Sequence, residues 1–413
     1  MPVKDSRYGL VILVVGALTL VGAGGFVRYT FPLLLPAMRV GLGANYGQMG
    51  LLATGNSIGY VISSLLGGIL GTRFGARRVI SISMFLAGVM TFATGLSPGV
   101  EFALVVQFLS GLAAGGCVIP AVGLAATWFE PGKRGIATGI IVGGMPLGVL
   151  ISSRFLPVML DNMGEGAWRY GWMVMGVLTV FLGLLSLLLV RDRPREVGGE
   201  SEMPLNGPAP ASPISWGLAY KNRGIWLLCA LNMSVGLAGA IFATFFVAYL
   251  VAHWGITPSQ AGDAYGLVGL AGAVSGLFWG YVSDRIGRRL GLAADYYIFF
   301  VSLVILTFVS FPGAEYVAAF LGGLTLWGGM TVTIALAGDL VGARMVSAAF
   351  GLISLSFNLG QMVSPTLAGA VTDATGSFTP SLITAVVFAF AAASVCLFLP
   401  GRGSPQSIAP LHR

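Results

Sequence analysis

Charged residues are scarce in this chain: Asp, Glu, Lys and Arg make up 9% of its 413 residues, against roughly 25% in soluble domains. Long polar segments are scarce as well, and no stretch between the apolar runs is long enough for a separate soluble domain. Hydrophobic residues make up 56% of the chain. This composition excludes a water-soluble globular protein and indicates a chain that lies in a lipid bilayer.

Cysteine and histidine are also rare. Cys117, Cys229 and Cys396 lie inside apolar runs without metal-binding spacing, so we expect free, buried thiols. His253 and His412 lie beside a turn and in the tail, and neither has the setting of a catalytic base. The sequence has no nucleophile triad, metal cluster or phosphate-binding glycine loop between a strand and a helix. We therefore expect no enzymatic activity, no ATP-driven pumping and no cofactor.

The net charge of +7 does not predict nucleic-acid binding, because the basic residues lie between apolar runs and form no surface with interleaved aromatics. What the chain has in abundance is apolar runs of about 20 residues or more, the length that a membrane-spanning helix needs. We predict twelve spans, at 9–35, 47–71, 79–97, 102–127, 135–158, 169–190, 224–251, 260–282, 291–311, 315–338, 346–370 and 378–399.

An even number of spans places both termini on one side of the membrane. Most of the 22 Lys and Arg residues fall in the segments on that side, which the positive-inside rule makes cytoplasmic. The first apolar run is too long for the core of a signal peptide, and further spans follow it. We therefore expect a multi-pass protein of the bacterial inner membrane, surrounded by lipid, with both termini cytoplasmic.

Residues 191–223, rich in proline and glycine, predict a flexible cytoplasmic linker. The linker separates residues 1–190 from residues 224–399, each with six predicted spans, and residues 400–413 form a cytoplasmic tail. The chain is therefore predicted to be an all-α membrane protein of two six-helix halves.

The two halves carry the same residues at a constant offset. Arg73 and Arg285 are 212 positions apart (285 − 73), as are Asp161 and Asp373 (373 − 161), and several glycines follow the same register. This register indicates an internal duplication. Parallel halves of this kind form transporters that rock about a central site near the middle of the bilayer.

Spans eight and nine are joined by the sequence Gly280-Tyr-Val-Ser-Asp284-Arg285-Ile-Gly287-Arg288-Arg289. Asp284 can hold Arg288 or cap a nearby helix, which would stabilise one conformation of a rocking pair. In the first-half copy Thr72 stands in place of the acid, so that its latch should be weaker. The residues we expect in these conformational latches are Asp284, Arg285, Arg288, Arg73 and Arg77.

This sequence resembles the signature of the major facilitator superfamily, Gly-x-x-x-Asp-Arg-x-Gly-Arg-Arg. The resemblance implies the major facilitator fold, a monomer, and a pathway lined by spans one, four, seven and ten with two, five, eight and eleven beside them. It identifies no substrate. The segment from Trp128 to Gly148 is similar to the start of span five in monocarboxylate transporters and oxalate/formate exchangers. The segment from Arg28 to Met38 resembles the first span of a poorly characterised bacterial branch.

Small residues recur every four positions and predict helix packing faces. One such face lies in span two and continues from Gly55 through Gly59 to Gly71. A second is expected at the start of span five, at Gly135, Gly139 and Gly143.

Charges inside the predicted spans are few. Arg28 lies in span one, where an arginine costs about 2.5 to 3.5 kcal/mol on insertion scales and normally faces a cavity or a partner. It could bind an anion, or it could reach outward or bond carbonyls freed near Pro32. Arg154 lies nearer the outer face, within reach of Asp161 or lipid headgroups. Asp295 is the one acid clearly within a span, and because span nine is peripheral in the resembled fold we expect it to be structural.

A cavity with an arginine and no obvious acid suits a small organic anion, a monocarboxylate being one candidate, that enters with a proton or exchanges for another anion. A proton-coupled exporter of hydrophobic or drug-like compounds is the alternative, and a transporter-shaped sensor or lipid-handling protein is a third. The polar side chains that we expect at the substrate are Arg28, Tyr29, Asn56, Tyr60, Gln107, Arg154, Asn232, Tyr249, Tyr265, Trp327, Asn358 and Gln361.

Overall fold

The computed structural model describes residues 3–130, 132–164, 166–192, 222–309, 311–342 and 345–399. These residues form helices and no strands. The first half holds α1 (Val3–Leu20), the π-helix η1 (Val21–Phe26), α2 (Phe31–Gly41), α3 (Tyr46–Phe74), α4 (Ala76–Gly95), α5 (Val100–Trp128), α6 (Arg134–Val142), α7 (Gly144–Met163) and α8 (Ala167–Leu189). The second half holds α10 (Arg223–His253), α11 (Pro258–Ile286), α12 (Arg288–Phe308), α13 (Ala314–Leu326), α14 (Gly328–Val341), α15 (Val346–Thr375) and α16 (Thr379–Cys396).

Eleven segments of the described chain are long and apolar enough to cross a membrane. Three of them are interrupted helices: α1 with η1 and α2, α6 with α7, and α13 with α14. The 30-residue α15, which carries Asn358 and Gln361, is the twelfth long helix. The predicted all-α membrane protein is confirmed. The predicted linker lies outside the described residues between 192 and 222, and the predicted tail lies outside them beyond 399.

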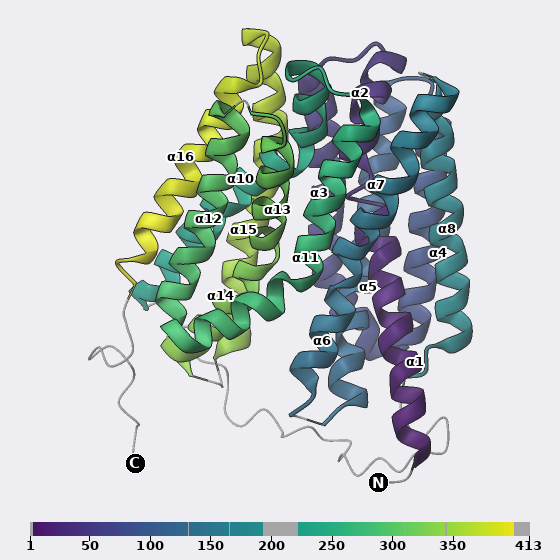
Figure 1. The fold of residues 1–413 in the computed structure, drawn as a ribbon. Coiled ribbons are helices and arrows are strands. Elements are labelled where there is room, and N and C mark those ends of the chain that lie inside the picture. Colours follow the sequence, from purple (N-terminus) through teal and green to yellow (C-terminus); the bar gives the residue numbers. More distant parts are fainter. Residues whose placement is uncertain are drawn as a thin grey trace.

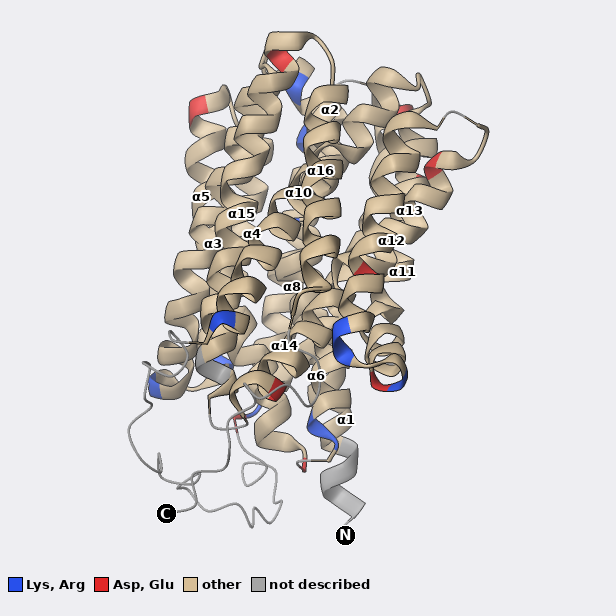
Figure 2. Ribbon diagram, turned by 90° about the vertical axis from the view of Figure 1, so that its left-hand side faces the viewer, with Lys and Arg blue, Asp and Glu red and all other residues tan. Residues whose placement is uncertain are grey.

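The helices form two bundles that stand side by side (Figure 1). Within the first, α3 packs on α5 and α4 on α8; within the second, α10 packs on α15 and α12 on α16. We call the end of the molecule where α1 begins and α16 ends the terminal end, and the other the distal end. Charged residues gather at these two ends, and the middle of the bundle is nearly free of them (Figure 2).

Glycines allow the α3–α5 contact. A Cβ on Gly67 would lie 2.5 Å from the carbonyl oxygen of Gly116, and Cβ atoms on Gly59 and Gly111 would overlap the backbone of the facing helix. The backbones therefore approach more closely than larger side chains would permit, as in other membrane helix pairs. The predicted packing face of span two is confirmed.

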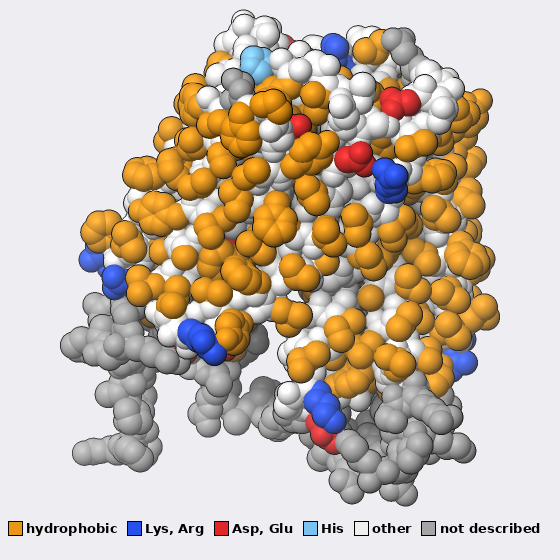
Figure 3. All heavy atoms as spheres, viewed as in Figure 1, with side chains coloured by type: hydrophobic (Ala, Val, Ile, Leu, Met, Phe, Trp, Pro, Cys, Tyr) orange, Lys and Arg blue, Asp and Glu red, His pale blue; other side chains and the backbone are white. Residues whose placement is uncertain are grey.

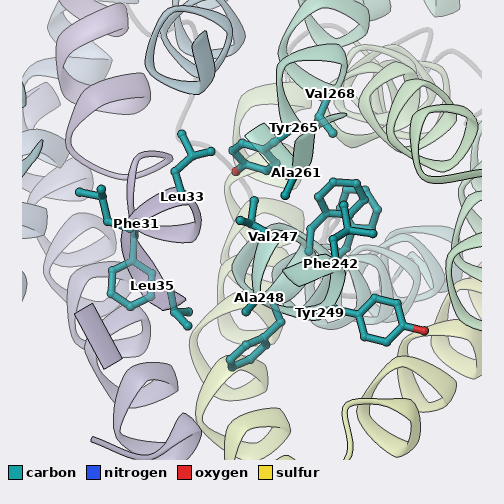
Figure 4. Packing of buried hydrophobic residues seen from close by; sticks show 14 of the residues in the cluster. Phe31, Leu33, Leu35, Phe242, Val247, Ala248, Tyr249, Ala261, Tyr265 and Val268 are labelled. Carbon is teal, nitrogen blue, oxygen red and sulfur yellow. The ribbon is translucent and has the colours of Figure 1, made fainter. Parts of the chain in front are cut away.

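The two halves meet at the distal end. Side chains of α2, α10 and α11 fill the space between them with apolar groups, among them Phe31, Leu33, Phe242 and Tyr265 (Figure 4). Burial of such side chains is the main favourable contribution to a tight contact. The pathway is therefore closed at the distal end.

Two carboxylates also join the halves at the distal end. Asp373, at the end of α15, accepts hydrogen bonds from the backbone N–H groups of Tyr46 and Gly47 at 2.9 and 2.7 Å. Asp161, at the end of α7, accepts a hydrogen bond from the hydroxyl of Ser259 near the start of α11. The repeated aspartates therefore make equivalent contacts, in which each half binds a helix start of the other, although the donors are backbone N–H groups in one contact and a hydroxyl in the other.

The halves separate toward the terminal end. A Cβ on Gly135, Gly139 or Gly351 would meet nothing within 4 Å, and the space-filling view is hollowed between the halves at its lower edge (Figure 3). The expectation that Gly135 and Gly139 form a packing face is wrong for this conformation, because no helix lies against them. The space between the halves is therefore open toward the terminal end.

Candidate functional site

Span one is interrupted at the centre of the molecule. After the π-helical turn Val21–Phe26, the N–H groups of Arg28 and Tyr29 both donate to the carbonyl oxygen of Gly24 at 3.1 Å, and α2 begins only at Phe31. Pro32 has no N–H group, and its ring excludes the carbonyl four residues before it, which is that of Arg28. Irregular backbone at membrane depth is tolerated where it lines a cavity.

Arg28 extends from this interruption toward the second half. Its guanidinium donates to Oε1 of Gln361 on α15 at 2.7 Å and to Oγ of Ser57 on α3 at 3.3 Å. It also lies over the ring of Tyr60, 4.7 Å from the centroid, and 5.9 Å from that of Tyr29. No Asp or Glu of the described residues lies within ion-pair distance of Arg28. The described contacts of the Arg28 guanidinium are therefore all with uncharged groups.

A cavity between the halves is lined by this guanidinium. Both halves contribute to its wall, whose residues are Arg28, Tyr29, Phe31, Pro32, Ala53, Asn56, Ser57, Gln107, Ala240, Ala243, Thr244, Gln361 and Pro365. Five of the predicted site residues therefore lie together: Arg28, Tyr29, Asn56, Gln107 and Gln361. Tyr60 adjoins them through its contact with Arg28.

The amides of the cavity have different roles. Asn56 donates to the backbone and side-chain oxygens of Gln107, both at 3.1 Å, and to Ser110 at 3.0 Å, so it joins α3 to α5. Nε2 of Gln107 is buried and has no hydrogen-bond partner. Arg28 and Gln107 therefore offer donors to a bound molecule, and the arrangement suits an acceptor-rich, negatively charged one.

Several predicted site residues lie elsewhere. The side-chain amides of Asn232 and Asn358 donate to carbonyls of their own helices, at 2.9 and 2.7 Å. Tyr249 and Tyr265 are buried in the apolar contact that closes the distal end. Trp327 lies between α13 and α14, its ring edge-on to Tyr29 with centroids 5.6 Å apart, so it adjoins the wall of the cavity.

Arg154 does not join Arg28. Its side chain is 78% exposed and pairs with Asp263 of α11 at 3.1 Å. The acid predicted to be within its reach, as an alternative to lipid headgroups, was Asp161, which instead binds Ser259. The sequence distance from Arg154 to Asp161 is short, but the two halves bring a different acid nearer.

Sequence reasoning missed Ser57 and Thr244 in the cavity wall. Ser57 directly follows Asn56, and Thr244 is a polar residue on a pathway helix. A short hydroxyl side chain on an apolar helix is a weak signal, because it can bond a carbonyl of its own helix.

The residues of the predicted second-half latch contact one another within their own half. Asp284 pairs with Arg288 at 3.2 Å, and Arg288 also lies 3.3 Å from Asp339 of α14. Arg285 lies over the ring of Tyr281, 4.5 Å from its centroid. Arg288 thus links α11, α12 and α14 at the terminal end.

The first-half copy has a different acid. Asp192, which follows α8, accepts a hydrogen bond from the backbone N–H of Arg77 at 2.8 Å, at the start of α4. The guanidinium of Arg77 donates to the carbonyl of Leu187 at 2.8 Å, and Arg73 lies over the ring of Phe74. A carboxylate at a helix start is favourable because of the free N–H groups there. Asp192 thus places a carboxylate at the start of α4, in the first-half copy of the motif where Thr72 replaces the acid.

The sequence of this chain is similar to those of several known transporters. The Probable sulfoacetate transporter SauU of Cupriavidus necator is 26% identical over 386 residues, covering 85% of this chain and 84% of that protein. The Hexuronate transporter of Bacillus subtilis is 25% identical, covering 92% of each. The Probable galactarate/D-glucarate transporter GudP of Escherichia coli is 24% identical, covering 91% of this chain and 89% of that protein.

The fold is shared with a solved transporter, a bacterial homolog of the human lysosomal transporter Spinster. The two align with a TM-score of 0.77 and 15% identity over 99% of this chain and 100% of that one. The family model of the Major Facilitator Superfamily matches residues 17–250 and 228–411. On this match, the chain belongs to the Major Facilitator Superfamily of membrane transporters and is not an enzyme.

Proposed function

We propose that this protein moves small organic anions across the bacterial inner membrane by alternating access, as a secondary active transporter. The observation that carries the proposal is the half-buried guanidinium of Arg28 in a cavity between the halves, with no carboxylate partner among the described residues. An intramembrane arginine without a partner acid is stabilised when an anionic ligand supplies the missing charge.

The chemistry of the cavity supports the same class of substrate. A fixed positive charge attracts an anion far more strongly in a low-dielectric cavity than in water, and the planar guanidinium can bind a carboxylate through two parallel hydrogen bonds. Gln107 adds a buried donor. The three relatives named above are described as transporters of sulfoacetate, hexuronate and galactarate/D-glucarate, all of them organic anions.

The direction and the driving force complete the proposal. Arg73, Arg77, Arg285 and Arg288 lie at the terminal end, so the positive-inside rule assigns that end to the cytoplasm. The structure then corresponds to an inward-open state. Transport proceeds by proton symport or by anion exchange, and the protein acts as a monomer.

The test is uptake into proteoliposomes that contain the full-length protein. Labelled glucuronate, glucarate and sulfoacetate are supplied with and without a pH gradient. Arg28→Gln should abolish nearly all uptake, and Arg28→Lys should weaken binding, because lysine cannot provide the two-pronged contact. Arg154→Gln, which removes an exposed arginine outside the cavity, is the matched control and should keep the native affinity for the anion, although the loss of its pair with Asp263 of the other half can change the turnover rate.

Two results would reject the proposal. One is normal transport of these anions by a correctly inserted Arg28→Gln protein. The other is a native protein that ignores all three anions and instead moves lipophilic cations, which would favour the proton-coupled exporter.

A further inference from the structure

Asp295 lies two turns after the start of α12 and has no exposed surface. It is the one Asp or Glu among the described residues that is buried. Neither of its carboxyl oxygens has a hydrogen-bond partner, and no basic side chain of the described residues is within ion-pair distance. Intramembrane acids are rare and mostly functional. Because the packing around Asp295 gives its carboxyl no stabilising partner, a functional role is favoured.

The groups around Asp295 are nearly all uncharged. On α14, a Cβ at Gly329 would lie 2.5 Å from Oδ2 of Asp295, and Thr333, four residues further along, is fully buried beside Tyr296. The nearby titratable groups are Tyr296 on α12 itself and Cys396 on α16, both buried. The helices α11 and α13, which also pack on α12, bring no described charged side chain into hydrogen-bond or ion-pair contact with Asp295.

A carboxylate in such surroundings would be an unpaired buried charge, which is costly enough that the group takes up a proton instead. The carboxylic acid is uncharged and suits the apolar cluster of α12, α14 and α16. A metal cation would need several oxygen ligands, and the side chains named here supply only the carboxyl and the hydroxyls of Thr333 and Tyr296. A proton is therefore the ligand that these surroundings fit.

The carboxyl is connected to the substrate cavity through the interruption of span ten. Gly329 lies two residues after Trp327, where α13 ends and α14 begins. The ring of Trp327 meets Tyr29, the neighbour of Arg28 in the cavity wall. At the same interruption, the indole N–H of Trp279 donates to the carbonyl oxygen of Leu324 at 3.0 Å. A shift of Tyr29 on anion binding would thus be passed to the segment that covers Asp295.

We propose that Asp295 is the proton-binding site that couples this transporter to the proton gradient, a role that rests on the proposed anion transport. In the state described here Gly329 covers the carboxylic acid and keeps water out. When the interruption at Trp327 moves, water reaches the group, its O–H bond breaks, and the proton passes to water as hydronium and leaves a carboxylate. The carboxylate takes a proton from hydronium of the outer medium, leaving water, before the cover closes again.

The test compares the native protein with Asp295→Asn in proteoliposomes, with labelled glucuronate as the probe. Native uptake should draw protons in, seen as alkalinisation of a weakly buffered outer medium, and a pH gradient should raise accumulation at least tenfold. Asp295→Asn should lose that accumulation yet still exchange labelled for unlabelled glucuronate, since Arg28 is intact. Asp295→Glu should retain proton coupling with a shifted pH profile. Native uptake without proton movement, or accumulation by Asp295→Asn equal to that of the native protein, would overturn the assignment.

A second measurement needs no substrate and separates this proposal from the function it rests on. The infrared spectrum of the native protein at neutral pH should contain the C=O band of a protonated carboxylic acid that Asp295→Asn lacks. Equal spectra would reject proton binding at Asp295. A native protein that shows this band but moves none of the three anions would reject the proposed function and leave the proton site standing. A requirement for sodium in place of a pH gradient would reject the proton as the coupling ion.

Discussion

The closure of the distal end should depend on Asp373. This carboxylate crosses from α15 to the start of α3, where it accepts hydrogen bonds from two backbone N–H groups. Asp373→Asn removes the charge and one of the two accepting oxygens while leaving the shape nearly unchanged. We expect the distal end to open more often, because this contact exists only while the two halves are together there.

The size of the effect follows from the exposure of the group. Hydrogen bonds to a charged group contribute about 1.5 to 3 kcal/mol, but Asp373 is exposed, and a carboxylate at an exposed helix start contributes about 0.3 to 1 kcal/mol. We take about 1 kcal/mol, which is roughly a fivefold change in population. Asp161→Asn should act similarly, and the two together should give about 2 kcal/mol, or roughly thirtyfold, because distant sites add.

The assay is the reaction of a cysteine at Ala53, in the cavity wall, with a membrane-impermeant thiol reagent added outside. Cys117, Cys229 and Cys396 are buried and are replaced in the background. Asp373→Asn should raise the labelling rate about fivefold, and less at high salt, which screens exposed charges.

Glu315→Gln is the matched control, since Glu315 is a distal acid that bonds only the N–H of Gly313 within its own half, at 3.1 Å. An unchanged labelling rate in Asp373→Asn, or an equal rise in Glu315→Gln, would refute the reasoning.

Two further predictions concern the terminal end and the orientation. Asp284→Asn should slow transport turnover more than Thr72→Ala does, and should leave substrate affinity nearly intact. The reason is that Asp284 pairs with Arg288, whereas the Thr72 hydroxyl bonds only a carbonyl of its own helix. Equal turnover of the two variants, measured by uptake, would show that the Asp284–Arg288 pair does not affect turnover. A cysteine at Gly99, in the distal turn after α4, should react from outside the cell, and one at Gly132 only after permeabilisation; the reverse labelling would invert the proposed orientation.

Periodicity and composition were enough to predict the helices and the two bundles, because lipid leaves the backbone few alternatives to a helix. Arg28 was also predictable, since an arginine within an apolar run is rare. Its partner Gln361 is 333 positions away, and no local pattern predicts that contact.

The misplaced site residues share a physical cause. A polar residue on a pathway helix can turn toward the cavity, toward a neighbouring helix or back to its own carbonyls, and the sequence does not fix which. The side chains of Asn232 and Asn358 bond carbonyls of their own helices. Arg154 meets Asp263 rather than Asp161 because tertiary packing, not sequence distance, sets the nearest acid.

The paired aspartates at the distal end have the geometry of an isologous interface in a two-fold dimer, in which patch A of one subunit meets patch B of the other, and the reverse. Asp161 faces Ser259, and Asp373 faces Gly47; Ser259 and Gly47 are themselves 212 positions apart (259 − 47). Once both copies lie in one chain, a substitution no longer appears twice, so each contact can change alone. The contact of Asp161 now uses a hydroxyl and that of Asp373 uses backbone N–H groups. The free energy needed to break each contact can therefore differ between the two sides of the pseudo-symmetric molecule.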